Sequence, residues 1–306
     1  MNFLELLGLS VLIYAFYQLF INALKAFYPL KNFSQRYGPN SWAVITGGSD
    51  GIGKGFAFVL AKHGFSICII ARNPQKLAKV KEEIEKRYPD TQVKWIKANF
   101  EEAFKPNFYE EIYKELEGLD ISILINNVGV AITNYFEQIP EDIIQKNLIV
   151  NIMPQVLLTR KLITKLLDRK GHKSAIINLS SVLGTHPIPY NTIYSSCKVF
   201  NDFFSRALNQ EYRKKIDILS LRPFYVSTPA TYDKKPCIDT ITAEECAEGC
   251  LRALGKWDFT WGHYKHAIQG FGYSFMPGWF VTLMAIIFGP YRVRYRTAQD
   301  KKYIRG

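Results

Sequence analysis

Short apolar runs alternate with amphipathic stretches along most of the chain, and this alternation predicts its secondary structure. Six apolar runs have the length and composition of buried strands, at residues 41–46, 65–71, 92–98, 120–125, 174–179 and 216–221. Four stretches have helical spacing: one ending at residue 61, one at 74–87, one or two helices over 141–168, and one continuing through 212. Strands that alternate with helices predict an α/β fold, a doubly wound parallel sheet in one domain over residues 37–270.

The N-terminal stretch over residues 6–24 is uncharged and mostly apolar. Its 19 residues would rise about 28 Å as a helix, close to the hydrocarbon thickness of a bilayer. Lys25, Lys31 and Arg36 follow it, which by the positive-inside rule places the rest of the chain in the cytosol. We expect residues 1–36 to form a membrane anchor with a basic flank. A buried or interfacial amphipathic helix is the alternative.

The last third of the chain combines covering elements with apolar and basic segments. Capping residues predict a helix within residues 229–254, and alternation over 261–269 predicts a last strand. Residues 277–291 are apolar but too short to span a bilayer comfortably, so we expect them to lie at the membrane interface, to re-enter it, or to pack on the core. Six Lys and Arg against one Asp in residues 292–306 would bind anionic headgroups. Residues 271–306 are therefore expected to be a membrane-associated segment.

Composition and charge narrow the class of protein. With 306 residues, 48% hydrophobic and 22% charged, the chain is globular. The formal net charge of +12 favours an anionic partner, either a lipid surface or a phosphorylated ligand. A nucleic-acid module is a poor fit, because the basic residues form no recognised nucleic-acid motif. The five cysteines are scattered and are expected to be reduced thiols, and no metal site is expected.

A glycine-rich turn stands between the first predicted strand and the first helix, in the sequence TGGSDGIG from Thr46. Gly47 permits a tight turn, while Gly51 and Gly53 let the backbone approach a pyrophosphate at a helix N-terminus, as in Rossmann-type folds. The next strand ends at Arg72, where NAD-binding folds often carry an acid for the ribose 2′-hydroxyl. An arginine suits a 2′-phosphate, which favours NADPH and NADP+; a solvated charge before a helix is the alternative.

The candidate chemistry centres on Tyr194 and Lys198. Four residues apart on a helix, they lie one turn apart on the same face. An ammonium beside a phenol favours the phenolate and lowers the tyrosine's pKa, which makes a proton donor for a carbonyl being reduced. Ser181, after the strand at 174–179, would lie at the carboxyl edge of the sheet and hydrogen-bond the same oxygen. Alone, such a Tyr–Lys pair is usual on solvated helix faces.

Together these motifs resemble the short-chain dehydrogenase/reductase family over roughly residues 40–270. They stand in the family's order and spacing: Thr46-Gly47-x-x-x-Gly51-Ile52-Gly53, Asn126-Asn127-Val128-Gly129, Asn151, Ser181 and Tyr194-x-x-x-Lys198. Within the family, the chain is most similar to the branch of membrane-bound very-long-chain 3-oxoacyl-CoA reductases and type 3 and type 12 17β-hydroxysteroid dehydrogenases. That narrower likeness is carried by residues 48–54, 61–64, 121–129, 193–195 and 223–228.

The resemblance implies a four-residue catalytic site. Tyr194 would protonate the carbonyl oxygen while the nicotinamide delivers hydride to the carbon. Lys198 would lower the pKa of Tyr194 and bind the nicotinamide ribose, Ser181 would polarise the carbonyl, and Asn151 would hold a water that replaces the proton. From the residues alone, Asn151 could instead cap a distorted helix turn, and Ser181 could bond backbone at a strand end.

The same resemblance assigns the cofactor contacts. They are Gly47, Ser49, Asp50, Gly51, Ile52, Gly53, Arg72, Asn99, Asn126, Gly129, Tyr194, Lys198, Pro223 and Val226. Two positions depart from the common pattern. Asn99 stands where many members carry an acid near the adenine, and Phe224 follows Pro223 where many carry glycine. The second departure weakens any transfer of substrate contacts from soluble members.

The activity that the resemblance implies is NADPH-dependent reduction of a 3-oxoacyl-CoA in long- and very-long-chain fatty acid elongation. The enzyme would be a homodimer at the endoplasmic reticulum membrane, with its catalytic domain facing the cytosol and other elongation enzymes as partners. One alternative is a dehydrogenase acting on a steroid ketone. Another is a catalytically silent NADP(H)-binding membrane scaffold.

Overall fold

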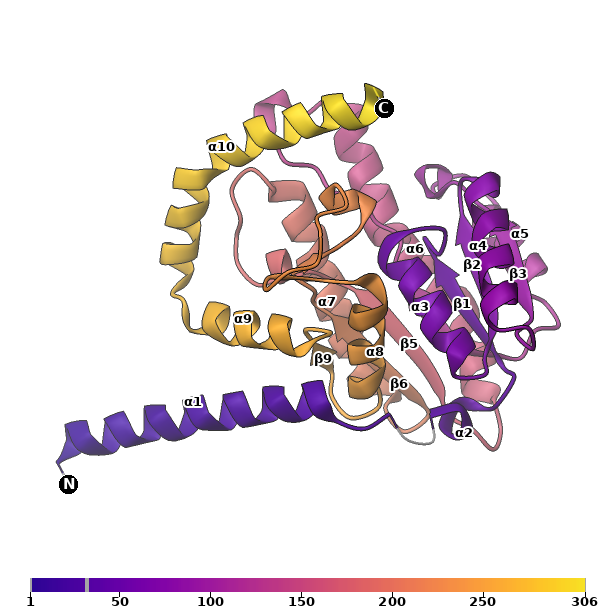
Figure 1. Ribbon diagram of the computed structural model, residues 1–306, viewed down its shortest axis with the longest axis horizontal. Helices are drawn as coiled ribbons and strands as arrows, with labels where there is room; N and C mark the ends of the chain where they lie inside the picture. The colour runs from indigo at the N-terminus through magenta and orange to yellow at the C-terminus, as the bar shows by residue number, and fades with distance from the viewer. Residues whose placement is uncertain (1, 31–32, 306) are drawn as a thin grey trace.

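The computed structural model describes residues 2–30 and 33–305. A seven-stranded parallel sheet forms its centre, with strand order β3-β2-β1-β4-β5-β6-β9 (Figure 1). The strands are β1 (Trp42–Thr46), β2 (Ser66–Ala71), β3 (Val93–Lys97), β4 (Ile121–Asn126), β5 (Ser174–Leu179), β6 (Ile216–Leu221) and β9 (Phe259–Thr260). The strand order reverses between β1 and β4, and such a switch point opens a crevice at the carboxyl ends of the strands.

Helices cover both faces of the sheet, which is why most of its strands are buried along their whole length. One hydrophobic core joins the sheet to α3 (Gly51–Lys62), α4 (Pro74–Arg87) and α8 (Ala243–Ala253). The other core joins it to α5 (Phe108–Glu115), α6 (Glu141–Asp168) and α7 (Thr192–Tyr212). Successive side chains of β1 divide between them: Ile45 enters the first core and Val44 the second.

Short elements surround the carboxyl edge of the sheet. They are η1 (Phe100–Glu102), η2 (Phe136–Gln138), η3 (Val182–Gly184), η4 (Pro229–Thr231) and the parallel pair β7 (Tyr225–Val226) and β8 (Thr240–Ile241). The predicted α/β fold is confirmed, and 141–168 forms one helix that contains Pro154.

The predicted last strand over 261–269 is wrong. The last strand is the two-residue β9, and the segment after it enters α9 (Tyr264–Phe275). The ring of His263 accepts a hydrogen bond from the Lys265 N–H and caps this helix. The buried residues of α9 are His266, Ala267 and Gly270, a spacing that places them on one helical face rather than on alternate sides of a strand.

Three further helices lie outside the two cores: α1 (Phe3–Phe27), α2 (Phe33–Tyr37) and α10 (Gly278–Arg305). α1 extends away from the sheet and packs against α9 (Figure 1). The Tyr14 and Phe275 rings meet edge to face at this contact. Within the described residues, no single helix is long and apolar enough to cross a membrane. Phe3–Gln18 is a shorter apolar helix. α9 and Gly278–Gln299 are long and apolar enough to cross a membrane only when taken together, and they are bent by 109° relative to each other.

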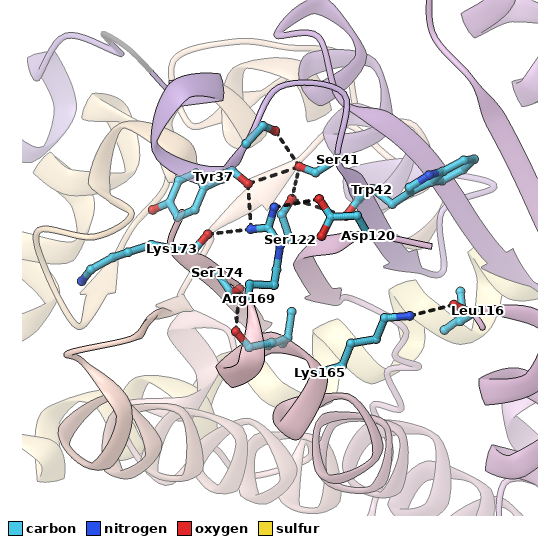
Figure 2. Close-up of polar contacts among 12 residues, drawn as sticks. Tyr37, Ser41, Trp42, Leu116, Asp120, Ser122, Lys165, Arg169, Lys173 and Ser174 are labelled. Atoms are coloured by element: carbon cyan, nitrogen blue, oxygen red, sulfur yellow. Dashed lines mark hydrogen bonds and ion pairs between the residues drawn. The ribbon is translucent and has the colours of Figure 1, made fainter. Parts of the chain in front are cut away.

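A polar network fixes the segment after α1 to the amino edge of the sheet. Figure 2 shows Arg169, at the end of α6, donating to both Asp120 carboxylate oxygens at 2.7 and 2.9 Å and to the Tyr37 carbonyl at 2.8 Å. The Tyr37 hydroxyl and the Arg36 guanidinium both donate to Asp217, which is buried on β6. These bonds fix the position of the chain where it enters β1 at the amino edge of the sheet. The candidate site residues lie at the other edge, at the carboxyl ends of the strands.

Candidate active site

Thr46 and Asn127 lock together the loops that leave β1 and β4. The Thr46 hydroxyl oxygen accepts hydrogen bonds from the N–H groups of Asn127 and Val128, at 2.9 and 3.1 Å. The Asn127 amide donates back to the carbonyls of Thr46 and Gly47. Gly47 adopts φ +65°, and a Cβ at Gly53 would collide with the Gly47 carbonyl. This turn therefore requires its glycines, and the crevice at the switch point is preformed.

The N-terminus of α3 faces this crevice. Asp50 caps the helix by accepting from the Gly51 N–H at 2.9 Å, and it also pairs with Lys76. Ser49 and Ile52 are half-buried on either side of Asp50 and Gly51. A cavity of about 600 Å³ flanks this turn, lined among others by Gly51 and Thr228. Unpaired N–H groups at a helix start bind pyrophosphate, so the local structure suits a dinucleotide.

Arg72 and Asn99 follow the neighbouring strands β2 and β3 at the same edge of the sheet. The Arg72 side chain is 69% exposed and pairs with Glu101 at 2.9 Å. The Asn99 side chain accepts from the Glu101 N–H at 3.3 Å and caps η1. Arg72 thus lies at the carboxyl edge of the sheet with an exposed guanidinium, and a carboxylate is its present partner.

Tyr194 and Ser181 meet at the carboxyl end of β5. Their hydroxyls are hydrogen-bonded, and the Ser181 oxygen also accepts from the Leu183 N–H at 3.2 Å. One turn along α7, the buried Lys198 ammonium lies 5.4 Å from the centroid of the Tyr194 ring and donates to the Leu179 carbonyl at 3.1 Å. The three predicted catalytic side chains are therefore brought together.

Burial acts on the pKa of both ionisable groups in opposite directions. The pKa of Tyr194 is raised, against the lowering predicted from Lys198, because desolvation outweighs the hydrogen bond from Ser181 and the positive charge of Arg296 on α10, which lower it. Desolvation lowers the pKa of Lys198 to about 8. The lysine thus remains a cation at neutral pH, close to the point where it loses its proton.

Asn151 joins α6 to the loop after β4. Its amide donates to the carbonyls of Val130 and Asn147, both at 2.8 Å, and its oxygen accepts from the Val130 N–H at 3.3 Å. A Cβ at Gly129 would lie 2.8 Å from the Asn151 oxygen and 3.3 Å from the Lys198 nitrogen. Asn151 and Lys198 therefore meet at Gly129, where a side chain would contact both.

Other predicted cofactor residues lie further from this point. The Asn126 amide is buried and donates to Thr159 and Asn178, so it joins β4 to β5 and α6. The Pro223 carbonyl accepts from the Val182 N–H at 3.1 Å. Val226 is buried on β7, where it pairs with β8.

Sequence reasoning missed Asn201. Its buried amide donates to the Asn151 carbonyl at 3.0 Å and to the Leu179 carbonyl at 3.3 Å. A usable signal was present, since Tyr194, Lys198 and Asn201 follow i, i+4, i+7 spacing and share a helix face. No signal pointed to Arg296, which stands in a different helix 102 positions later.

The family described as short chain dehydrogenase matches residues 41–237. This match covers the sheet from β1 to β6, the glycine turn and the Ser181–Tyr194–Lys198 group, and the chain belongs to that family of oxidoreductases. Among its relatives, the chain is 41% identical over 234 residues to very-long-chain 3-oxoacyl-CoA reductase-B of Danio rerio, which covers 75% of this chain and 73% of that protein. It is 36% identical to the very-long-chain 3-oxoacyl-CoA reductase of Homo sapiens, over 79% of this chain and 77% of that protein.

Solved structures share the fold. A 7β-hydroxysteroid dehydrogenase aligns with a TM-score of 0.70 at 21% identity, over 86% of this chain and 98% of its own. The L-sorbose reductase of Gluconobacter frateurii, complexed with NADPH, aligns with a TM-score of 0.64 at 22% identity, over 75% and 98%.

The residues of this chain fit a nicotinamide dinucleotide. Besides the glycine turn, Lys198 presents a buried ammonium whose hydrogen-bond acceptor among the described residues is the Leu179 carbonyl. An ammonium has three donors, so two remain for ribose hydroxyls.

Proposed function

We propose that this chain reduces the 3-keto group of a long-chain 3-oxoacyl-CoA to the 3-hydroxyacyl-CoA, with NADPH, in fatty acid elongation. The observation that carries the proposal is the hydrogen-bonded Ser181–Tyr194 pair above a buried Lys198, in a chain 41% identical to a very-long-chain 3-oxoacyl-CoA reductase. The geometry supports the reaction, and the relatives support the substrate class.

The side chains divide the work of carbonyl reduction. Bound NADPH supplies the hydride that reaches the carbonyl carbon. Tyr194 donates its proton to the carbonyl oxygen, and Ser181 hydrogen-bonds that oxygen and stabilises its developing negative charge. Lys198 holds the cofactor ribose and places a positive charge beneath the tyrosine. Asn151 orients the backbone around Val130 and holds the water through which Tyr194 regains its proton.

Arg72 supports NADPH as the cofactor in preference to NADH. No acid stands at this strand end to accept a hydrogen bond from a 2′-hydroxyl. A guanidinium there binds a 2′-phosphate through charge-assisted hydrogen bonds. The exposed ion pair with Glu101 would give way to the phosphate when the cofactor binds.

The ends of the chain support attachment to a membrane. We assign residues 1–36 to an anchor and its flank, 37–270 to the reductase domain and 271–306 to a membrane-associated segment. The described apolar side chains of α1 are largely exposed, as lipid contact requires. A place at the endoplasmic reticulum, with the domain facing the cytosol, agrees with the basic residues after α1 and with the elongation reaction.

Exposed apolar side chains on α6 and α7 support a homodimer. Leu148 of α6 and Val199, Phe200 and Phe203 of α7 lie at the surface. A second copy would cover them with the same surface about a two-fold axis.

The test is NADPH oxidation by the detergent-solubilised full chain. Long-chain 3-oxoacyl-CoA and a 17-ketosteroid are offered in parallel, with Tyr194→Phe as the control. The proposal requires turnover of the acyl-CoA that is lost in the variant. Turnover of the steroid alone would show that the substrate is a steroid ketone and not a 3-oxoacyl-CoA. NADPH binding without turnover of either ketone would leave the scaffold function.

A further inference from the structure

The elbow formed by α9 and α10 packs on the loop that leads to Tyr194. Val281 and Ala285 of α10 are buried against Ile188, in the loop that joins β5 to α7. Further along α10, Gly289 lies flush against the Tyr190 ring and leaves no room for a Cβ. This loop leads directly into α7, the helix that carries Tyr194. The packing of α10 therefore fixes the position of the loop beside the active site.

The same helix also contacts a second segment, the one that follows η4. Tyr232 follows η4, and its hydroxyl donates to the Arg296 carbonyl at 3.4 Å. The Arg296 guanidinium lies 5.7 Å from the centroid of the Tyr232 ring, and Tyr295 meets that ring edge to face. A single helix therefore contacts both the loop before α7 and the segment after η4. Figure 1 shows α10 running across this side of the domain.

α9 is hydrogen-bonded to the segment 223–226, which contains the predicted cofactor residues Pro223 and Val226. The ring of His266 is buried and accepts from the Phe224 N–H at 3.4 Å, and its other nitrogen lies 3.1 Å from the Tyr225 carbonyl. The Tyr273 ring packs edge to face on His186. Movement of the elbow would thus be transmitted to both substrate and cofactor sides of the site.

The outer face of the elbow is apolar and exposed. No charged residue occurs from 277 to 291. Trp279 is 69% exposed and Phe288 is 52% exposed. Their exposed apolar neighbours are Phe275, Met276, Leu283, Ile286, Ile287 and Tyr291. Single surface apolar residues are ordinary, but a continuous set of this size marks an interaction surface.

Two observations identify a lipid bilayer as the occupant of this surface. The apolar face continues onto the exposed apolar helix α1 through the Tyr14–Phe275 contact. It is followed at once by the exposed Arg292 and Arg294, where anionic headgroups would lie at the edge of the hydrocarbon. The 109° bend lets the pair enter and leave the same leaflet.

We propose that the α9–α10 elbow inserts into one leaflet and covers the substrate side of the active site, so that a long acyl chain passes from the bilayer to Tyr194 beneath α10. This inference rests on the proposed long-chain substrate. A chain that stays in lipid avoids the free-energy cost of exposing its methylene groups to water.

The depth of Trp279 tests the insertion. The full chain is reconstituted in phosphatidylcholine vesicles that contain brominated acyl chains, and tryptophan quenching is compared with that of Trp279→Phe. We expect the variant to lose most of the brominated-lipid quenching. Equal quenching in both proteins, or access of aqueous iodide to Trp279 in vesicles, would overturn the insertion and leave water or another protein against this face.

Phe288→Asp tests the delivery of substrate, and Phe104→Asp is its matched control, since Phe104 is 60% exposed on the far side of the sheet. With vesicle-borne long-chain 3-oxoacyl-CoA, we expect kcat/KM to fall at least tenfold in Phe288→Asp and to stay unchanged in the control. With water-soluble acetoacetyl-CoA, both variants should match the parent chain. An unchanged long-chain rate, or an equal loss with both substrates, would overturn the inference. Inactivity of the parent chain with both substrates would instead overturn the proposed function.

Discussion

Lys198 and Asn201, one helical turn apart on α7, donate to the same acceptor, the carbonyl oxygen of Leu179. Leu179 is the last residue of β5, and Ser181 follows it by two positions. Asn201 also donates to the Asn151 carbonyl. Lys198 is therefore held at the end of β5, two residues before Ser181, and α6 is held in the same network.

Asn201→Leu should weaken this register. The substitution removes both hydrogen bonds of the amide and leaves the buried Asn151 carbonyl without this donor, which costs about 1–3 kcal/mol of unfolding free energy. We also expect kcat to fall roughly tenfold, because Lys198 and Asn151 lose a shared support. Urea unfolding and steady-state assays measure the two effects. Asn209→Leu, nearer the end of α7, should change neither; equal effects in both variants would contradict the assignment.

Removing the proton donor is the most direct change. Tyr194→Phe keeps the ring over Lys198 but deletes the hydroxyl, and general acid catalysis is worth about 10²–10⁴ in rate. We expect kcat to drop within that range while NADPH binding, followed by cofactor fluorescence, stays within about twofold of the parent value. Retention of more than a tenth of the parent kcat would show that another group donates the proton.

Cofactor preference should depend on Arg72. Arg72→Ala loses charge-assisted hydrogen bonds to the 2′-phosphate, each worth about 1.5–3 kcal/mol, so KM for NADPH should rise at least tenfold while KM for NADH stays unchanged. Glu101→Gln removes the competing carboxylate and should lower KM for NADPH. Parallel changes for both cofactors in either variant would argue against a 2′-phosphate contact.

Lys198 should make stability depend on pH. Burial lowers its folded-state pKa from 10.5 to about 8, so between these values the unfolded chain binds more protons than the folded one. Unfolding free energy therefore rises with pH from about 8 to 10.5, by an amount that approaches about 3 kcal/mol for this group. Urea unfolding of the parent chain and of Lys198→Met at pH 8 and 10.5 checks the difference. The variant should lack this gain; an equal gain in both would assign it to other groups.

The sequence predicted those features of the fold and site that depend on residues near one another in the chain. Buried strands such as Ile121–Asn126 were predictable because unbroken apolar runs occur where helices cover both faces of a sheet. Tyr194 and Lys198 were predictable as neighbours because four-residue spacing fixes their common face. The strand predicted over 261–269 failed because a short alternating segment is ambiguous, and the cap at His263 favoured a helix. The position of Arg296 was beyond reach, since it depends on the path of α10 across the domain.

Arg296 should set the upper limit of the pH–rate profile. Its charge lowers the pKa of Tyr194, together with the Ser181 hydrogen bond and against desolvation and the neighbouring Cys197. Tyr194 acts as a proton donor, so reduction slows as pH rises through this pKa. Arg296→Met removes the charge, raises the pKa of Tyr194 and should move the fall in kcat/KM to higher pH, whereas Arg296→Lys should restore the parent profile. The profile is measured with water-soluble acetoacetyl-CoA, so that membrane delivery of the substrate does not contribute. A lower rate with an unshifted profile would show that Arg296 acts by packing on Tyr232 alone.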